Sequence, residues 1–126
     1  MKNASKILKT MSVSLSCGQP VEVKPSQTKI VAYSLFPAQS TATSGYVLAR
    51  AGVNNNGPVR VRLVDENGNA LSNYVDSYSS YITKLPLTNV NITTTNEPVV
   101  VRVEVVNKST VEQSYASVHD VLLQLS

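Results

Sequence analysis

The sequence predicts an all-β protein, a two-sheet antiparallel β-sandwich preceded by an N-terminal arm. Runs of β-branched residues with alternating polarity recur along most of the chain, and short clusters of Gly, Pro, Asn and Ser separate them. The longest such run, residues 98–106, would place valines on one face and two charges on the other if it were extended. No stretch shows the long periodicity of an amphipathic helix.

Length and composition fit one folded domain. The 126 residues are enough to bury a core without disulfide bonds. Hydrophobic residues make up 42% of the chain and charged residues 15%, which describes a folded protein whose weakly charged surface tolerates contact with other proteins. The net charge of +3 is too small to indicate nucleic acid as a partner. No run approaches the roughly 18 apolar residues of a membrane span.

Basic residues concentrate near the N-terminus. We assign residues 1–11 to an arm and residues 12–126 to a single sandwich domain. Within the arm, Lys2, Lys6 and Lys9 are candidate contacts with other subunits of an assembly. The apolar stretch after these lysines is too short and too rich in serine for a signal peptide, so we expect synthesis in the cytoplasm without secretion.

The first strands are expected to be short. Residues 13–17 form one candidate, and residues 21–23 form a second that ends before Pro25, which cannot donate to a strand ladder. A longer strand follows at residues 29–36. Its alternation predicts that Val31, Tyr33 and Leu35 face the core.

The middle of the chain predicts a loop and then a hairpin. Residues 37–45 are small and polar and predict a surface loop. Residues 46–53 and 59–64 alternate in polarity on either side of an Asn-Asn-Asn-Gly-Pro turn, so we expect them to pair as a hairpin. In the second of these strands, the inward side chains should be Val59, Val61 and Leu63, and the outward ones Arg60 and Arg62.

The remaining strands follow the same pattern. Tyrosines in residues 73–81 have helical spacing, but the serines among them weaken a helix, so we expect a loop that leads into a strand near residue 81. A further strand is expected at residues 87–94. Valines at positions 99, 101, 103 and 105 should face inward from the valine-rich strand, and Val121, Leu123 and Leu125 from the last strand, residues 115–125.

Counted this way, the chain has about eight or nine strands, which suits a jelly-roll or related topology. An immunoglobulin-like sandwich is the alternative, but the sequence has no Trp and no cysteine pair to support it.

Four segments of residues 46–125 resemble jelly-roll modules of the carbohydrate-binding and galactose-binding-like type. They are the strand Val59 to Val64, the entry Tyr81-Ile82-Thr83-Lys84, the strand Val99 to Val106, and the ending Asp120-Val121-Leu122-Leu123. The sequence departs from these modules where Tyr81 replaces a common Trp, His119 replaces one acid of the usual pair, and no acidic calcium cluster is evident. The resemblance implies a jelly-roll fold and sugar binding as one function.

The chain also looks like accessory proteins of bacteriophage heads, such as decoration proteins and head-fibre bases. Its short length, weak charge, basic arm and Asn/Ser/Thr-rich loops carry this likeness. The likeness implies capsid or other virion subunits as partners. It is an analogy of fold and composition, which by itself does not establish function.

The sequence does not indicate metal, cofactor or catalytic chemistry. One histidine and one cysteine, His119 and Cys17, are too few for a zinc site built on such ligands. Adjacent strand residues point to opposite faces, so His119 and Asp120 cannot form an acid–base dyad. Oxygen-bearing residues at 65–69 could ligate calcium, but their spacing misses the EF-hand pattern and a hairpin turn explains them. We expect no enzyme and no cofactor.

Aromatic and basic side chains offer two candidate surfaces. The first is a platform for sugar rings made by Tyr74, Tyr78 and Tyr81, because aromatic rings stack on apolar sugar faces. Packing over the sandwich edge or in a subunit interface is the alternative for these tyrosines. The second involves four arginines on outward strand faces, for which cross-strand ion pairs are expected and an anion patch is the alternative: Arg50, Arg60, Arg62 and Arg102.

These observations lead to one main hypothesis. The chain is expected to be a non-enzymatic structural subunit of a larger assembly, a phage virion, in contact with capsid subunits or further copies of itself. The alternative is a carbohydrate-binding sandwich module with glycan as its partner.

Overall fold

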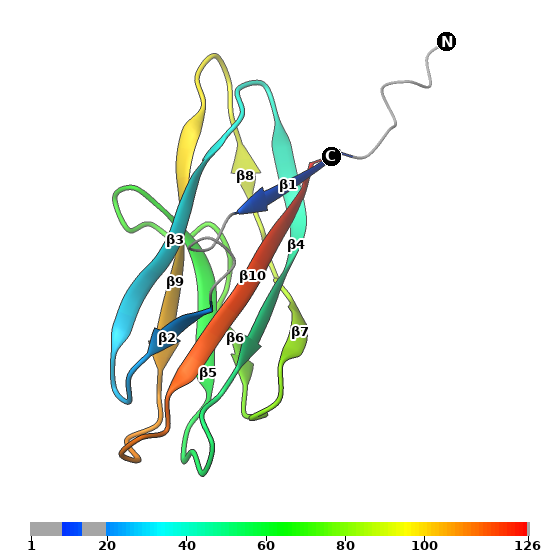
Figure 1. Ribbon diagram of the computed structural model, residues 1–126. Helices are drawn as coiled ribbons and strands as arrows, with labels where there is room; N and C mark the ends of the chain where they lie inside the picture. Colours follow the sequence, from blue (N-terminus) through cyan, green and yellow to red (C-terminus); the bar gives the residue numbers. More distant parts are fainter. Residues whose placement is uncertain (1–8, 14–19, 126) are drawn as a thin grey trace.

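The computed structural model describes residues 9–13 and 20–125, which form two antiparallel sheets packed face to face (Figure 1). The strands are β1 (Lys9–Val13), β2 (Val21–Val23), β3 (Thr28–Phe36), β4 (Thr41–Arg50), β5 (Val59–Asp65), β6 (Val75–Ser77), β7 (Thr83–Pro86), β8 (Ile92–Thr93), β9 (Val99–Asn107) and β10 (Ala116–Leu125). The first sheet has the order β1-β10-β4-β7, with β2 also paired to β10 and β8 to β4. The second sheet has the order β3-β9-β5-β6. The predicted two-sheet β-sandwich is confirmed.

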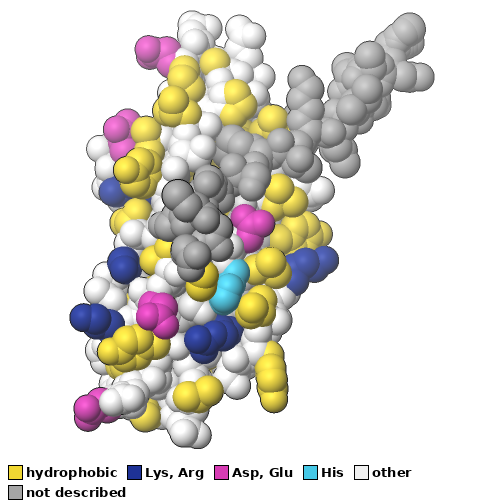
Figure 2. Space-filling model, in the orientation of Figure 1, with side chains coloured by type: hydrophobic (Ala, Val, Ile, Leu, Met, Phe, Trp, Pro, Cys, Tyr) yellow, Lys and Arg dark blue, Asp and Glu magenta, His cyan; other side chains and the backbone are white. Residues whose placement is uncertain are grey.

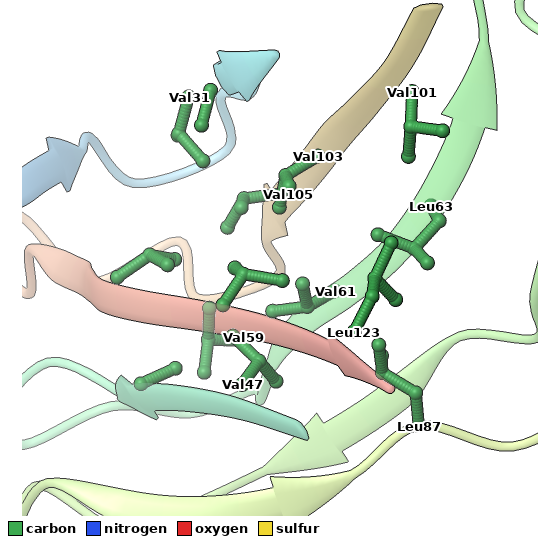
Figure 3. Close-up of a cluster of buried hydrophobic side chains, with 14 of the residues drawn as sticks. Val31, Val47, Val59, Val61, Leu63, Leu87, Val101, Val103, Val105 and Leu123 are labelled. Carbon is green, nitrogen blue, oxygen red and sulfur yellow. The ribbon is translucent and has the colours of Figure 1, made fainter. Parts of the chain in front are cut away.

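The core lies between the sheets and follows the alternation of the sequence. Its second-sheet side includes fully buried side chains from β5 and β9, namely Val59, Val61, Leu63, Val101, Val103 and Val105 (Figure 3). The first sheet contributes Val47, Val121 and Leu123, which are also buried. Apart from Val47, these residues were predicted to face inward, although Val99, also predicted inward at the start of β9, is 37% exposed.

The predicted core face of β3 is wrong for two of its three residues. Tyr33 is 72% exposed and Leu35 is 61% exposed, whereas only Val31 is buried as expected. The register of β3 against β9 shifts between Ile30 and Ala32. This bulge turns Val31 and Ala32 both inward and reverses the alternation for the rest of the strand.

The predicted surface loop at residues 37–45 is also wrong in its second half, because β4 begins at Thr41. This segment pairs with both β8 and β10. A Cβ atom on Gly45 would lie 2.7 Å from the carbonyl oxygen of Leu122. Close approach to the neighbouring strand therefore explains the glycine at this position.

The predicted hairpin between residues 46–53 and 59–64 does not form. Strand β4 belongs to the first sheet and β5 to the second, so the turn at residues 54–58 carries the chain from one sheet to the other. Asn54 has a φ of 52°, as the turn chemistry predicts. The turn was therefore recognised, and the pairing of its flanking strands was not.

The N-terminal boundary differs from the predicted strand. Strand β1 begins at Lys9, inside the segment assigned to the arm, and pairs antiparallel with β10. The predicted strand at residues 13–17 falls, beyond Val13, outside the described residues. Within the described ranges, no helix has the length and apolar character needed to cross a bilayer.

Candidate functional site

Exposed apolar side chains concentrate at opposite ends of the sandwich. The β3 patch consists of Tyr33 and Leu35, with exposed fractions of 72% and 61%. Tyr33 and Leu35 share the outer face of β3, whereas Val99 pairs with the buried Phe36 and therefore lies on the inner face at the end of β9. The patch lies towards the end of the molecule where β3 leads into β4 (Figure 1).

The tip patch lies at the other end of the sandwich and consists of Val53, Tyr78, Tyr81 and Ile82. Their loops are tied together, because the side chain of Asn55 donates hydrogen bonds to the carbonyl oxygens of Gly52 at 2.8 Å and Tyr78 at 3.1 Å. The exposed fraction of Tyr81 is 81%, the largest among the exposed large hydrophobic residues of the described chain. Two of the three tyrosines singled out in the sequence therefore lie exposed on one connection, between β6 and β7.

The third tyrosine, Tyr74, belongs to a different surface. Its ring lies under the guanidinium of Arg62, 4.3 Å from the ring centre, and its hydroxyl donates a 2.6 Å hydrogen bond to Glu104. Arg62 also donates to Glu104 from Nε at 2.8 Å, and these two residues are direct cross-strand partners. Tyr74 is held by charged neighbours and does not join Tyr78 and Tyr81 in one platform.

Burial and hydrogen bonds shift the pKa values within this cluster. Burial, aided by the hydrogen bond to Glu104, raises the pKa of Tyr74. For Glu104, burial would raise the pKa, but hydrogen bonds from Tyr74 and Arg62 outweigh it and hold the pKa of this carboxyl below its ordinary value. Glu104 is therefore ionised at neutral pH and anchors the outer face of the second sheet.

The other arginines form the contacts expected of cross-strand pairing. Arg60 lies directly opposite Asp76 and forms an ion pair with it at 3.0 Å. Arg102 donates from Nε to the backbone carbonyl of Asp65 at 3.2 Å. Arg50 donates to the carbonyl of Ala51 at 3.4 Å. The predicted ion pairing is confirmed for Arg60 and Arg62.

The acidic segment at residues 65–69 forms a turn. Asp65 Oδ1 accepts hydrogen bonds from the backbone N–H groups of Asn67 at 2.8 Å and Asn69 at 2.9 Å. Its pKa is lowered, chiefly by the Asn69 N–H. The carboxylate is thus used by the turn itself, and no group of three or more metal-ligating side chains occurs in residues 9–13 and 20–125.

His119 and Asp120 have separate partners. His119 Nε2 is hydrogen-bonded to the hydroxyl of Ser117 at 2.9 Å, and Asp120 Oδ1 accepts a bond from the backbone N–H of Val121 at 2.8 Å. Burial, with the nearby charge of Arg50, lowers the pKa of His119. The register of β10 against β4 shifts between Val118 and Asp120, so His119 is skipped in the pairing of the two strands. The sequence did not predict this local irregularity.

A hollow on the outer face of the first sheet was also missed by sequence analysis. Its volume is about 310 Å³, and it is lined by Tyr46, Leu48, Lys84, Asp120, Val121 and Leu122. These residues come from β4, β7 and β10, whose neighbouring positions only the sheet order reveals. A second hollow of about 470 Å³ is lined by Glu22, Arg50, Val53, Gln113 and Tyr115.

The candidate arm residues are only partly described. Lys2, Lys6 and Cys17 lie outside the described residues. Lys9 begins β1, and only its backbone is described.

No protein-family model and no curated protein matches the sequence. Solved structures do match the fold. A chain of the cyanophage Pam1 capsid asymmetric unit is 14% identical with a TM-score of 0.57, covering 94% of this chain and 83% of that one. The EclA C-terminal domain, a sugar-binding protein, is 11% identical with a TM-score of 0.56, covering 87% and 80%.

A third similar structure is the CBM36-1 domain of a multidomain xylanase from the hindgut metagenome of Trinervitermes trinervoides. It is 13% identical with a TM-score of 0.52, and the match covers 95% of this chain and 97% of that one. At these identities the likeness shows the fold alone. The sandwich is jelly-roll-like, as the resemblance of its strand segments to such modules implied.

Proposed function

We propose that the protein is a non-enzymatic structural subunit of a larger protein assembly, an accessory component of a phage virion. The observation that carries this proposal is the presence of two separate apolar patches at opposite ends of one sandwich. Large apolar groups gathered on a surface mark contact sites, and tyrosine is enriched at protein interfaces. A body with a contact site at each end can connect two neighbours.

The virion is the assembly that the fold favours. A capsid chain of a cyanophage has a similar sandwich over most of both chains. The N-terminal lysines supply a second means of attachment, by docking on an acidic surface of a capsid subunit. Because β1 begins at Lys9, deletion of residues 1–8 removes Lys2 and Lys6 and leaves this strand intact.

Sedimentation of the native protein from its source tests the proposal. The lysate is separated on a density gradient, and the chain is detected with an antibody. We expect it to migrate with large particles. Recovery of the chain only among free proteins at the top of the gradient contradicts the proposal.

Rebinding of purified chains to particles that lack the subunit tests the patches and the arm. The variants are Y33S/L35S for the β3 patch, Y81S/I82S for the tip patch, and the deletion of residues 1–8. Each is expected to bind less than the wild type, because it removes part of the proposed contact. A matched control, V106S, changes a half-buried valine outside both patches and should retain binding.

Carbohydrate binding is the second candidate. The rings of Tyr78 and Tyr81 are 66% and 81% exposed on one connection, which suits stacking on the apolar face of a sugar. A sugar-binding protein has a similar fold. A glycan array compares the wild type with Y78A/Y81A, and with Y74A to test the remaining tyrosine. Absence of any glycan signal for the wild type removes this candidate.

A further inference from the structure

The hollow on the first sheet lies between two opposite charges. Strands β10, β4 and β7 place Asp120, Leu48 and Lys84 directly opposite one another in one row. The neighbouring row on the same face contains Leu122, Tyr46 and Pro86 in the same strand order. We call these two rows the shelf. Figure 2 shows hydrophobic side chains, in yellow, gathered over β10 and β4 with acidic and basic side chains beside them.

We propose that the shelf is the contact between two copies of this chain. The proposal rests on the assembly role proposed above and names the partner at one of its surfaces. Neither patch at the ends of the sandwich takes part in this contact.

The two charges of the shelf are available to a partner. Among the described residues, neither Asp120 nor Lys84 takes part in an ion pair. Lys84 Nζ lies 4.8 Å from the centre of the Tyr46 ring, and both charged residues are exposed. One oxygen of Asp120 accepts the Val121 N–H, and within residues 9–13 and 20–125 no hydrogen bond engages the other.

The order of the row makes the shelf complementary to itself. Consider a two-fold axis that lies in the interface, runs along β4 and passes over Leu48. Rotation about this axis exchanges the two sides of the row, so Asp120 of each copy faces Lys84 of the other. Leu48 then faces its own counterpart on the axis. The contact contains two ion pairs around an apolar centre.

The neighbouring row fits the same axis. Tyr46 lies on β4 and faces its counterpart, while Leu122 of each copy faces Pro86 of the other. Arg50 also lies on the outer face of β4, one row beyond Leu48. Its guanidinium donates to the carbonyl oxygen of Ala51, beyond the end of the shelf, and lines the separate hollow that also contains Glu22.

Charge selects this occupant over other partners. A uniformly acidic partner would pair with Lys84 and be repelled by Asp120, and a uniformly basic partner would meet the opposite problem. A partner must therefore present a carboxylate and an ammonium on either side of an apolar group. A second copy of the shelf carries this arrangement.

Charge reversal tests the contact. In K84E the introduced glutamate faces Asp120 of the other copy, and in D120K the introduced lysine faces Lys84. Each variant alone should dimerise more weakly by about tenfold or more, because like charges meet twice in each dimer. In an equimolar mixture, both pairs become attractive again. The mixture should form a heterodimer with close to wild-type affinity, measured by sedimentation equilibrium of the full chain.

Two matched controls accompany these variants. K108E and E112K make the same charge changes at exposed positions away from the shelf and should dimerise like the wild type. Circular dichroism verifies that every variant is folded. If the mixture regains dimerisation, this shows in addition that neither single variant lost dimerisation because it was unfolded.

Three outcomes overturn the inference: a wild type that stays monomeric at every concentration, single variants that dimerise normally, or a mixture that does not recover. These outcomes differ from failure of the assembly role. A chain that is monomeric in solution but sediments with particles from its source retains the assembly role and loses the shelf contact. A chain that dimerises through the shelf but never occurs in particles loses the assembly role and retains the contact.

Discussion

At the scale of single residues, Glu104 connects three elements of the second sheet. It accepts hydrogen bonds from Arg62 of β5 and from Tyr74, which precedes β6, while lying on β9 itself. The sequence predicted that the arginines would pair across strands, because Arg62 and Glu104 share the outward parity of their strands. It did not predict Tyr74 as a partner, because residues 73–81 carry no clear strand pattern.

Replacement of Glu104 by Gln should reduce the free energy of unfolding by about 1.5–3 kcal/mol at neutral pH, the range for hydrogen bonds to a charged group. The folded-state pKa of Glu104 lies below its ordinary value of 4.5. Its stabilisation is therefore complete above about pH 4.5 and is lost as the pH falls through the folded-state pKa. Urea titrations from neutral to acidic pH should show the difference between wild type and E104Q shrinking in acid.

A control for E104Q is E97Q, which neutralises an exposed carboxylate. It should change the free energy of unfolding little. A difference between wild type and E104Q that stays constant down to pH 2 would contradict the role of the ionised carboxylate.

His119 should contribute a separate pH dependence. Burial lowers its pKa below the ordinary 6.5, so the unfolded chain binds a proton more readily than the folded one. Stability is then complete above about pH 6.5 and falls as the pH drops through this value. H119Q should flatten this part of the pH profile of the free energy of unfolding. If the free energy of unfolding changes with pH by the same slope in wild type and H119Q between pH 7 and 5, this contribution of His119 is refuted.

At the scale of elements, alternation in the sequence predicted the strands that keep one register throughout. Strands β5 and β9 pair in one register, and their inward residues were identified correctly except for Val99; the neighbouring Leu63 and Val64 of β5 are both buried. Strand β3 was correctly predicted as a strand. Because it carries a bulge, the prediction of which side chains face the core was wrong. This single register shift is the reason that the exposure of Tyr33 and Leu35, which form the β3 patch, was not predicted. A bulge depends on the partner strand, which alternation within one strand does not reveal.

The end of β4 packs tightly against the connection between β9 and β10, and Gly52 makes this possible. A Cβ atom on Gly52 would lie 2.6 Å from the carbonyl oxygen of Ser114 and closer still to its carbonyl carbon. Backbone atoms cannot yield as a flexible side chain does. Gly52→Ala should therefore lower the free energy of unfolding by about 1–3 kcal/mol, the usual cost of overpacking, or more.

Gly68 provides the comparison for this substitution. A Cβ atom there meets nothing within 4 Å, but the φ of +86° disfavours side chains. Gly68→Ala should cost about 1–2 kcal/mol through backbone strain alone. Thermal melts of both variants measure the difference, and a G52A protein as stable as the wild type would show that the two loops do not pack as described.

At the scale of the whole molecule, sequence order and spatial order differ most for the first sheet. The last strand, β10, lies inside this sheet and pairs with β4 on one side and with β1 and β2 on the other. Alternation within a strand says nothing about which strands become neighbours. The shelf, whose rows join β10, β4 and β7, could therefore not be found from the sequence, although its residues other than Pro86 were assigned to strands there.

The central place of β10 predicts that the chain cannot fold without its last residues. A chain that ends at Tyr115 lacks β10, and with it Val118, Val121 and Leu123, which are almost completely buried in the core. It also leaves the inner edges of β4 and β1 without a partner. We expect this truncated chain to show no cooperative unfolding in urea, whereas a chain of residues 9–126, which keeps every described strand, should unfold cooperatively. Because these pairings join distant parts of the chain, refolding of the full protein should take milliseconds to seconds. A cooperative transition for residues 1–115 would show that the second sheet is stable without β10.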